Sequence, residues 1–142
     1  MEQETFKVVW HIQQWDHPLY QSAIEMRPYY MLRYALGEVT TPKVGYIFTF
    51  KSEEYARAFM EKGSSSMQRL LRCVGEVVES PYQRYICSYA QDIESFWTMW
   101  VHGDLKHVDP DLIHRGFVDT APPGTEYCTW VRPIEVLKAK GD

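Results

Sequence analysis

The chain has 142 residues, of which 45% are hydrophobic and 24% are charged, and this composition is typical of a globular protein rather than a disordered one. Its formal net charge of −4 argues against general nucleic-acid binding, because that activity needs a basic field to neutralise phosphates. The length predicts one globular domain over residues 1–142.

The N-terminal sequence MEQETFKVVW predicts no signal peptide, and no apolar run approaches the roughly 20 residues of a membrane span. The three cysteines, Cys73, Cys87 and Cys128, are an odd number without a CxxC pair, so neither a disulfide framework nor a zinc ribbon is indicated. We therefore expect a soluble cytoplasmic protein without membrane contact, whose reduced thiols act as small buried hydrophobic groups.

The first third of the chain predicts two strands. Apolar residues alternate over residues 6–12, which indicates a half-buried strand. Residues 13–28 combine proline with weak periodicity and predict a loop with a short helical turn. A second strand is expected over residues 30–36, and residues 37–45 then form a loop or a short hairpin connection.

The middle of the chain predicts a strand followed directly by a helix. Aromatic residues at alternate positions indicate a strand over residues 46–50. Ser52 is expected to cap a helix that runs to Lys62 and carries two glutamates in its first turn. Two pairs spaced i, i+4 are expected on the buried side of this helix, Tyr55 with Phe59 and Ala56 with Met60.

A β-hairpin and a second helix are predicted next. The hairpin spans residues 67–89, with its turn at Ser80 and Pro81, and Gly75 marks a bulge in its first strand. Apolar residues spaced i, i+3, i+4, i+7 and i+8 then predict a helix over residues 93–101 with a strongly apolar face.

The C-terminal part predicts a short helix over residues 110–115, a turn over 121–125 and a final strand over 126–131. Pro133 has no amide donor, so this end is expected to be either an edge strand or a break before residues 134–137. The mixed order of strands and helices predicts an α+β fold, in which one mainly antiparallel sheet packs against two principal helices.

The densest group of metal-ligand side chains lies in segment 102–114. Imidazole and carboxylate groups suit zinc, iron or manganese, but the segment has no HExxH spacing and several of its members fit helix-capping roles. A solvated loop is therefore preferred over a metal site, and a metal-dependent enzyme is the third of three functional hypotheses. The group comprises His102, Asp104, His107, Asp109, Asp111 and His114.

One family resemblance involves three regions of the chain. Arg33 lies on an early predicted strand, GYIFTFKSEEYARAF occupies residues 45–59, and Glu126 lies on the last predicted strand. This order resembles the Arg, Ser/Thr and Glu arrangement of ADP-ribosyltransferases. The chain lacks the family's Ser-Thr-Ser strand and its paired-Glu turn.

The resemblance implies roles for particular residues of this chain. Arg33 would hold a phosphate of a nicotinamide dinucleotide, and Thr49 or Ser52 would support its ribose. Glu126 or Glu135 would stabilise the oxocarbenium-like transition state. The local alternative is that Arg33 lies on a solvent-facing strand surface and that Ser52 only caps its helix. An ADP-ribosyltransferase-like enzyme is thus the second functional hypothesis.

The first hypothesis is a non-enzymatic module that binds a protein partner or a small polar ligand through aromatic side chains and arginine. Aromatic residues make up 15% of the chain, and tryptophan and tyrosine anchor interfaces well. The chain has no GxSxG, GxxxxGK or GxGxxG motif, so no catalytic residue, metal or cofactor is predicted. A homodimer through an edge strand near Pro133 or through an exposed cluster of aromatic rings is compatible with the sequence. The candidate ligand-binding residues are Arg33, Thr49, Ser52, Glu126 and Trp130.

Overall fold

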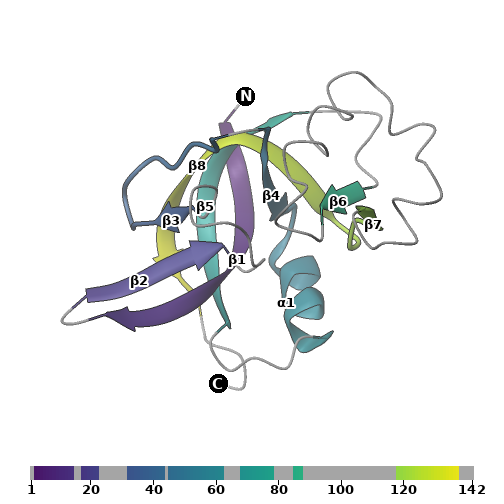
Figure 1. Cartoon of the computed structure of the whole chain (residues 1–142). Helices are drawn as coiled ribbons and strands as arrows, with labels where there is room; N and C mark the ends of the chain where they lie inside the picture. Colours follow the sequence, from purple (N-terminus) through teal and green to yellow (C-terminus); the bar gives the residue numbers. More distant parts are fainter. Residues whose placement is uncertain are drawn as a thin grey trace.

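The computed structural model describes residues 2–14, 17–22, 32–43, 45–62, 68–78, 85–87 and 118–137 (Figure 1). These residues form eight strands and one helix. The elements are β1 (Glu2–Gln14), β2 (His17–Ser22), β3 (Arg33–Tyr34), β4 (Ile47–Phe50), α1 (Glu53–Lys62), β5 (Gln68–Val78), β6 (Tyr85–Cys87), β7 (Val118–Thr120) and β8 (Thr125–Val136).

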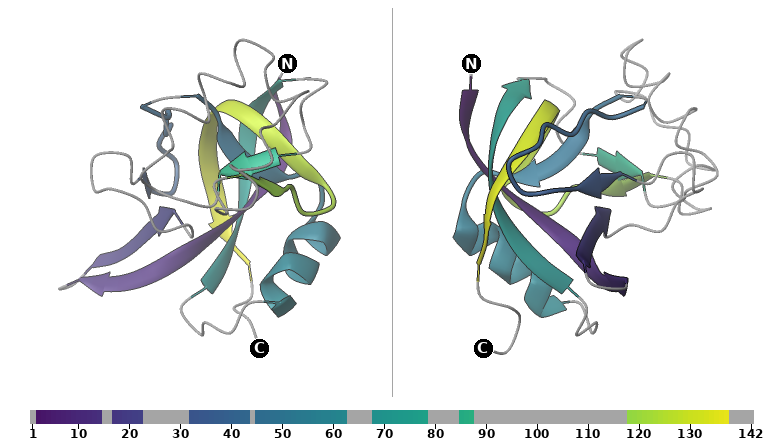
Figure 2. Two further views of the ribbon diagram at one scale, coloured as in Figure 1. Left: turned by 45° about the vertical axis from the view of Figure 1, so that its right-hand side comes forward. Right: turned by 90° about the vertical axis from the view of Figure 1, so that its left-hand side faces the viewer.

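Six of the strands form one antiparallel sheet in the order β3-β2-β1-β4-β8-β5. β1 also pairs with β5, from Glu2↔Glu76 to Trp10↔Gln68, so β1, β4, β8 and β5 form a closed ring. Figure 2 shows these strands curving around a common interior, with α1 on the outside. The closure matters because it gives each ring strand an inner face and an outer face.

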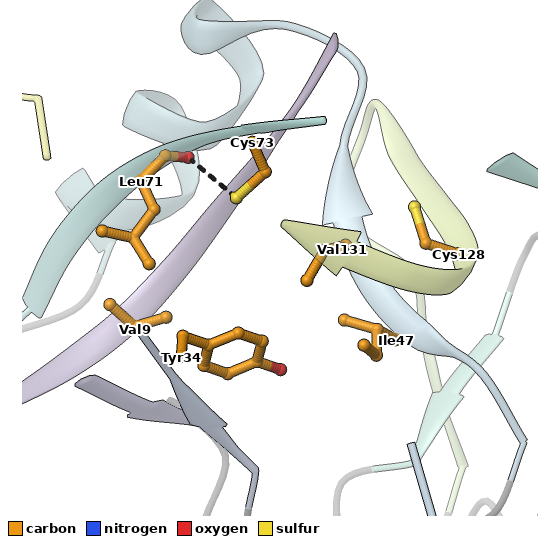
Figure 3. Packing of buried hydrophobic residues seen from close by; sticks show 7 residues of the cluster. All are labelled: Val9, Tyr34, Ile47, Leu71, Cys73, Cys128 and Val131. Carbon is orange, nitrogen blue, oxygen red and sulfur yellow. Dashed lines mark hydrogen bonds between the residues drawn. The ribbon is translucent and has the colours of Figure 1, made fainter. Parts of the chain in front are cut away.

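Both faces of β1 are buried, although the sequence predicted burial of only one. Val9 points into the ring and belongs to an inner cluster (Figure 3). Phe6 and Val8 point outward and are covered by α1, which contributes Ala56 and Met60 to an outer cluster. The inner cluster comprises Val9, Tyr34, Ile47, Leu71, Cys73, Cys128 and Val131.

The predicted strand and helix in the middle of the chain are confirmed. β4 falls within the expected range, and α1 begins directly after Ser52, whose Oγ accepts a hydrogen bond from the backbone N of Tyr55 at 3.3 Å. Ala56 and Met60 are buried as expected. Tyr55 is instead 38% exposed and lies against Gly124 in the turn before β8.

The Ser52 cap at the start of α1 is tested by a single substitution. Ser52→Ala should lower the free energy of unfolding by about 1 kcal/mol, because the first turn of α1 loses an acceptor for one of its free backbone amides. Urea denaturation measures the change, and Glu61→Ala on the exposed last turn should leave stability nearly unaltered. Equal midpoints for Ser52→Ala and the parent protein would contradict the capping role.

The predicted α+β fold with two principal helices is wrong. The part of the chain that the structure describes is mostly strand and has one helix of 10 residues. The expected helical turn within residues 13–28 is replaced over residues 17–22 by β2, because pairing with β1 overrides the weak local signal. The helices predicted over 93–101 and 110–115 lie outside the described residues.

The predicted hairpin in residues 67–89 is also wrong for the residues that can be compared. β5 pairs with β1 and β8, whereas β6 pairs with β7 in a separate two-stranded sheet. The reason is that alternation assigns side chains to faces of a strand but does not select the strand's partner. The bulge expected at Gly75 is confirmed, because the β5–β8 register shifts between Gly75 and Val77.

Pro133 is neither at a free edge nor at a break. β8 continues through it, and a second register shift between Arg72 and Cys73 accommodates the proline opposite β5. On the other side of the strand, the Pro133 carbonyl accepts a hydrogen bond from the Gly37 amide at 2.7 Å. This end of β8 therefore lacks the open edge that the first of the two homodimer contacts would use.

Among the described residues, no helix is long and apolar enough to cross a membrane.

Candidate functional site

A line of polar side chains crosses the inner face of the ring, and we call Thr5, Thr49, Glu126 and Cys128 the polar row. Thr49 and Glu126 are direct partners in the β4–β8 pairing. The Phe6↔Phe50 pair places β1 beside β4, so Thr5 reaches both of them. The row is thus assembled from three strands that are far apart in the sequence.

Thr5 is the hub of the polar row and is fully buried. Its Oγ1 lies 2.6 Å from Thr49 Oγ1, 3.2 Å from Glu126 Oε2 and 3.1 Å from the Phe50 carbonyl oxygen. Thr49 Oγ1 continues the row to Cys128 Sγ at 3.3 Å. Thr5 has one hydroxyl proton to donate, and the three oxygens around it, those of Thr49, Phe50 and Glu126, share this donor.

Glu126 supplies the carboxyl group of the polar row. Burial disfavours its charged form and raises the pKa of the carboxyl above its ordinary value. The hydrogen bond from Thr5, the charge of Lys51 and the hydrogen bond from Gln3 act in the opposite direction and lower the pKa, but burial prevails. The Gln3 Nε2 donor lies 3.4 Å from Glu126 Oε1, at the exposed end of the row.

Lys7 lies two residues beyond Thr5 on the same inner face of β1. β1 and β4 share a single paired position, Phe6↔Phe50, and the Lys7 side chain reaches from one strand to the other beyond it. Its Nζ donates a hydrogen bond to the Phe48 carbonyl oxygen at 2.7 Å and lies 5.9 Å from the centre of the Tyr34 ring. Burial lowers the pKa of this amine to about 8.

The sequence analysis missed Lys7, although one signal was present. Lys7 shares a face with Val9 in an alternating strand, and a lysine at a position that faces a core is uncommon. A half-buried strand buries only one face, and the face that carries Lys7 was expected to lie in solvent. Closure of the ring turns that face inward.

Two thiols lie near the amine. Cys73 and Cys128 are buried and unbonded to each other. Burial raises their pKa values to about 12 and about 11 respectively. Both therefore remain protonated at neutral pH, which makes them poor nucleophiles. Their burial as free thiols confirms the prediction for these two positions, and the side chain of Cys87 lies outside the described residues.

The structure brings together two of the five predicted ligand-binding residues, Thr49 and Glu126. Arg33 is exposed on β3, where its neighbour Tyr34 points into the ring, and Ser52 caps α1. Trp130 is half-buried on β8. In the portion of the chain with described side chains, these three residues form no hydrogen bond or ion pair with the polar row.

Glu135, the other carboxylate that the family resemblance considered, lies on the exposed surface of β8. It accepts a hydrogen bond from Arg72 Nε at 2.6 Å, and Arg72 also lies 3.6 Å from Glu4. This arrangement links β1, β5 and β8 on their solvent-facing side. Glu135 therefore belongs to a surface ion pair rather than to the polar row.

Among residues with described positions, no group of three or more His, Cys, Asp and Glu side chains is placed to hold a metal ion. The His/Asp-rich segment 102–114 lies outside those residues. The searches for related proteins were also negative: no family model, no curated protein and no solved structure matches the chain. The geometry of the polar row and Lys7 is accordingly the basis for a functional argument.

Proposed function

We propose that the protein is a non-enzymatic module that binds a small polar ligand at the polar row and Lys7. One observation carries the proposal: the hydrogen-bonded polar row and the amine of Lys7 lie on the inner face of the same ring, where apolar side chains would fill a closed core. Burial lowers the pKa of Lys7 and raises the pKa of Glu126, so the charged form of each group lowers the free energy of unfolding. Groups that are retained at such a cost concentrate at binding and catalytic sites.

The two groups define the chemistry of the ligand. A protonated amine has three donors, and within the described residues that of Lys7 makes one hydrogen bond, to Phe48. The ligand would therefore present an acceptor oxygen to Lys7. The Glu126 carboxyl, with Gln3 beside it at the exposed end of the row, would bind a hydroxyl or amide group. A small molecule with both kinds of group fits this description.

A small ligand is favoured over a protein partner because the described surface has no aromatic patch. Its large exposed apolar side chains include one aromatic, Tyr55, which packs on Gly124. Protein interfaces are usually anchored by clustered aromatic and arginine side chains. Trp130, proposed from the sequence as such an anchor, is half-buried.

The same geometry favours binding over the ADP-ribosyltransferase alternative. That activity would need Arg33 to share a cleft with Thr49 and with Glu126 or Glu135. Arg33 is exposed next to the inward-facing Tyr34, whereas Thr49 is buried on the inner face of β4. Glu135 is engaged with Arg72. Including a nicotinamide dinucleotide among the tested compounds examines this alternative directly.

The proposal is tested with a panel of small hydroxy acids, amino acids, keto acids and sugars, and with a nicotinamide dinucleotide. We expect at least one small compound to raise the melting temperature of the wild-type protein. Glu126→Gln and Thr49→Val should weaken its binding at least about tenfold, because each removes a group of the polar row. Isothermal titration calorimetry measures the affinities.

Glu135→Gln is the matched control, since it makes the same change at an exposed strand position. It should bind the compound as the wild type does. Glu126→Gln is expected to fold well at pH 7, because the carboxyl that it replaces is destabilised there by burial. Failure of every panel member to bind, or undiminished binding to Glu126→Gln, would refute the site.

A further inference from the structure

The junction between β1 and β4, which we call the seam, is the least paired part of the ring. β1 pairs with β5 over residues 2–10, and every residue of β4 pairs with β8. Between β1 and β4, two strands that are described over their whole length, the only paired position is Phe6↔Phe50. Regions with few paired backbone groups open at a lower free energy than the whole fold. The ring is therefore expected to open first at the seam.

Side chains of β1 hold the rest of the seam in place of backbone pairs. The Thr5 hydroxyl lies 2.6 Å from Thr49 Oγ1 and 3.1 Å from the Phe50 carbonyl oxygen, and Lys7 Nζ donates a hydrogen bond to the Phe48 carbonyl oxygen at 2.7 Å. Both side chains also belong to the proposed site. Because Thr5 has one hydroxyl proton, a ligand that accepts it releases the seam oxygens, so ligand binding and closure of the seam compete.

The two ends of the seam are held differently. Phe6 and Phe50 belong to the outer cluster with residues of α1, so the helix ties β1 to β4 at that end. The Phe48 ring instead packs against Tyr127 of β8, with the ring centres 5.3 Å apart. Separation at the Lys7 end also returns a charged amine to water, where its charged form is more stable, since burial lowers its pKa to about 8. The seam should thus part at Lys7 and Phe48 and pivot at Phe6 and Phe50.

A ligand needs such a movement to reach the polar row. Thr5 is 0% exposed and Thr49 is 1% exposed in the closed ring. We propose that β4, held by β8, swings away from β1 about the Phe6↔Phe50 pair, and that the ligand enters the ring through the seam opened in this way. This inference rests on the proposed function and adds to it the route by which the ligand reaches its site.

Cys128 reports the opening, because it is 0% exposed and its Sγ lies 3.3 Å from Thr49 Oγ1 on the inner side of the seam. The full-length protein is incubated with iodoacetamide at pH 7.5 and increasing urea, and peptide mass spectrometry measures the labelling of Cys128. We expect labelling at least about tenfold faster than the urea-derived free energy of unfolding allows, at a rate that changes little at low urea. A thiol exposed by global unfolding would instead be labelled at a rate that rises steeply with urea from the outset.

Thr5→Val tests whether the opening lies at the seam. Valine keeps the shape of threonine but removes the hydroxyl that joins β1 to β4, so the labelling of Cys128 should become at least about tenfold faster. Thr129→Val is the matched control, because the Thr129 hydroxyl donates a hydrogen bond to Glu76 Oε1 at 2.8 Å and joins β8 to β5 instead. It should change the labelling rate by no more than about twofold.

Labelling of the wild type that follows global unfolding, or an equal acceleration by Thr129→Val, would overturn opening at the seam. If a panel compound still binds in a manner that depends on Glu126, the proposed function stands without this entry route. Fast labelling of Cys128 in a protein that binds no panel compound would instead support the opening and refute the proposed function. The two failures are thereby distinguished.

Discussion

Raising the pH from 8 to 9.5 is expected to stabilise the wild type by about 2 kcal/mol relative to Lys7→Met. The ordinary pKa of lysine, 10.5, applies to the unfolded chain, and burial lowers it to about 8 in the fold. Between these two values the unfolded chain binds more protons, so the free energy of unfolding rises with pH. The destabilisation is complete below pH 8 and disappears above 10.5, and corresponds to about 3 kcal/mol in total.

The measurement is urea denaturation of the wild type and of Lys7→Met at several pH values between 7 and 9.5. Methionine has a similar volume without the charge, so the stability of Lys7→Met should lack this rise. The comparison with Lys7→Met is essential because Cys73 and Cys128 act with the opposite sign. The pKa values of these thiols are higher in the folded protein than in the unfolded chain. As the pH rises through about 9, the thiols therefore ionise in the unfolded chain but not in the fold, and the free energy of unfolding falls in both proteins.

Lys51→Met serves as the control for loss of an exposed lysine, and its pH dependence should parallel that of the wild type. A wild type whose stability falls or stays level relative to Lys7→Met between pH 8 and 9.5 would contradict the burial of the Lys7 amine.

The second large effect is expected from Gly75→Ala, which should lower the free energy of unfolding by about 2 to 3 kcal/mol. A Cβ at this buried position would lie 2.9 Å from the backbone oxygen of Trp130, 3.2 Å from Val131 Cγ1 and 3.3 Å from Cys128 Sγ. The closest of these atoms belongs to the backbone of the paired strand β8, which cannot rotate away. The ring would have to widen at the bulge.

Gly37→Ala separates this steric effect from the general cost of replacing a glycine. Gly37 has a φ of +82°, and a Cβ there would meet nothing within 4 Å, so the variant should lose only about 1 kcal/mol through backbone strain. Thermal and urea denaturation of both variants test the difference. Gly75→Ala with a stability equal to that of Gly37→Ala would show that β8 does not approach β5 this closely.

Local signals in the sequence were sufficient for the elements that depend on neighbours along the chain. Ser52 and the acidic first turn identified α1, because a cap and a first turn interact within a few residues. Gly75 was identified as a bulge, since a glycine inside an alternating strand is a known signal of one. Thr49 and Glu126 were identified as candidates without any indication that they are strand partners.

The sequence by itself thus determined α1 with its cap, the strand β4 and the side chains that share a face along β1. Only the tertiary structure decided that β1 pairs with β5, that the ring closes, and that the face carrying Thr5, Lys7 and Val9 points inward. The physical reason is that the alternation of apolar and polar residues assigns side chains to the two faces of a strand, whereas pairing between strands distant in the sequence decides which of those faces is buried. That choice moved Lys7 from an expected surface position to the proposed site.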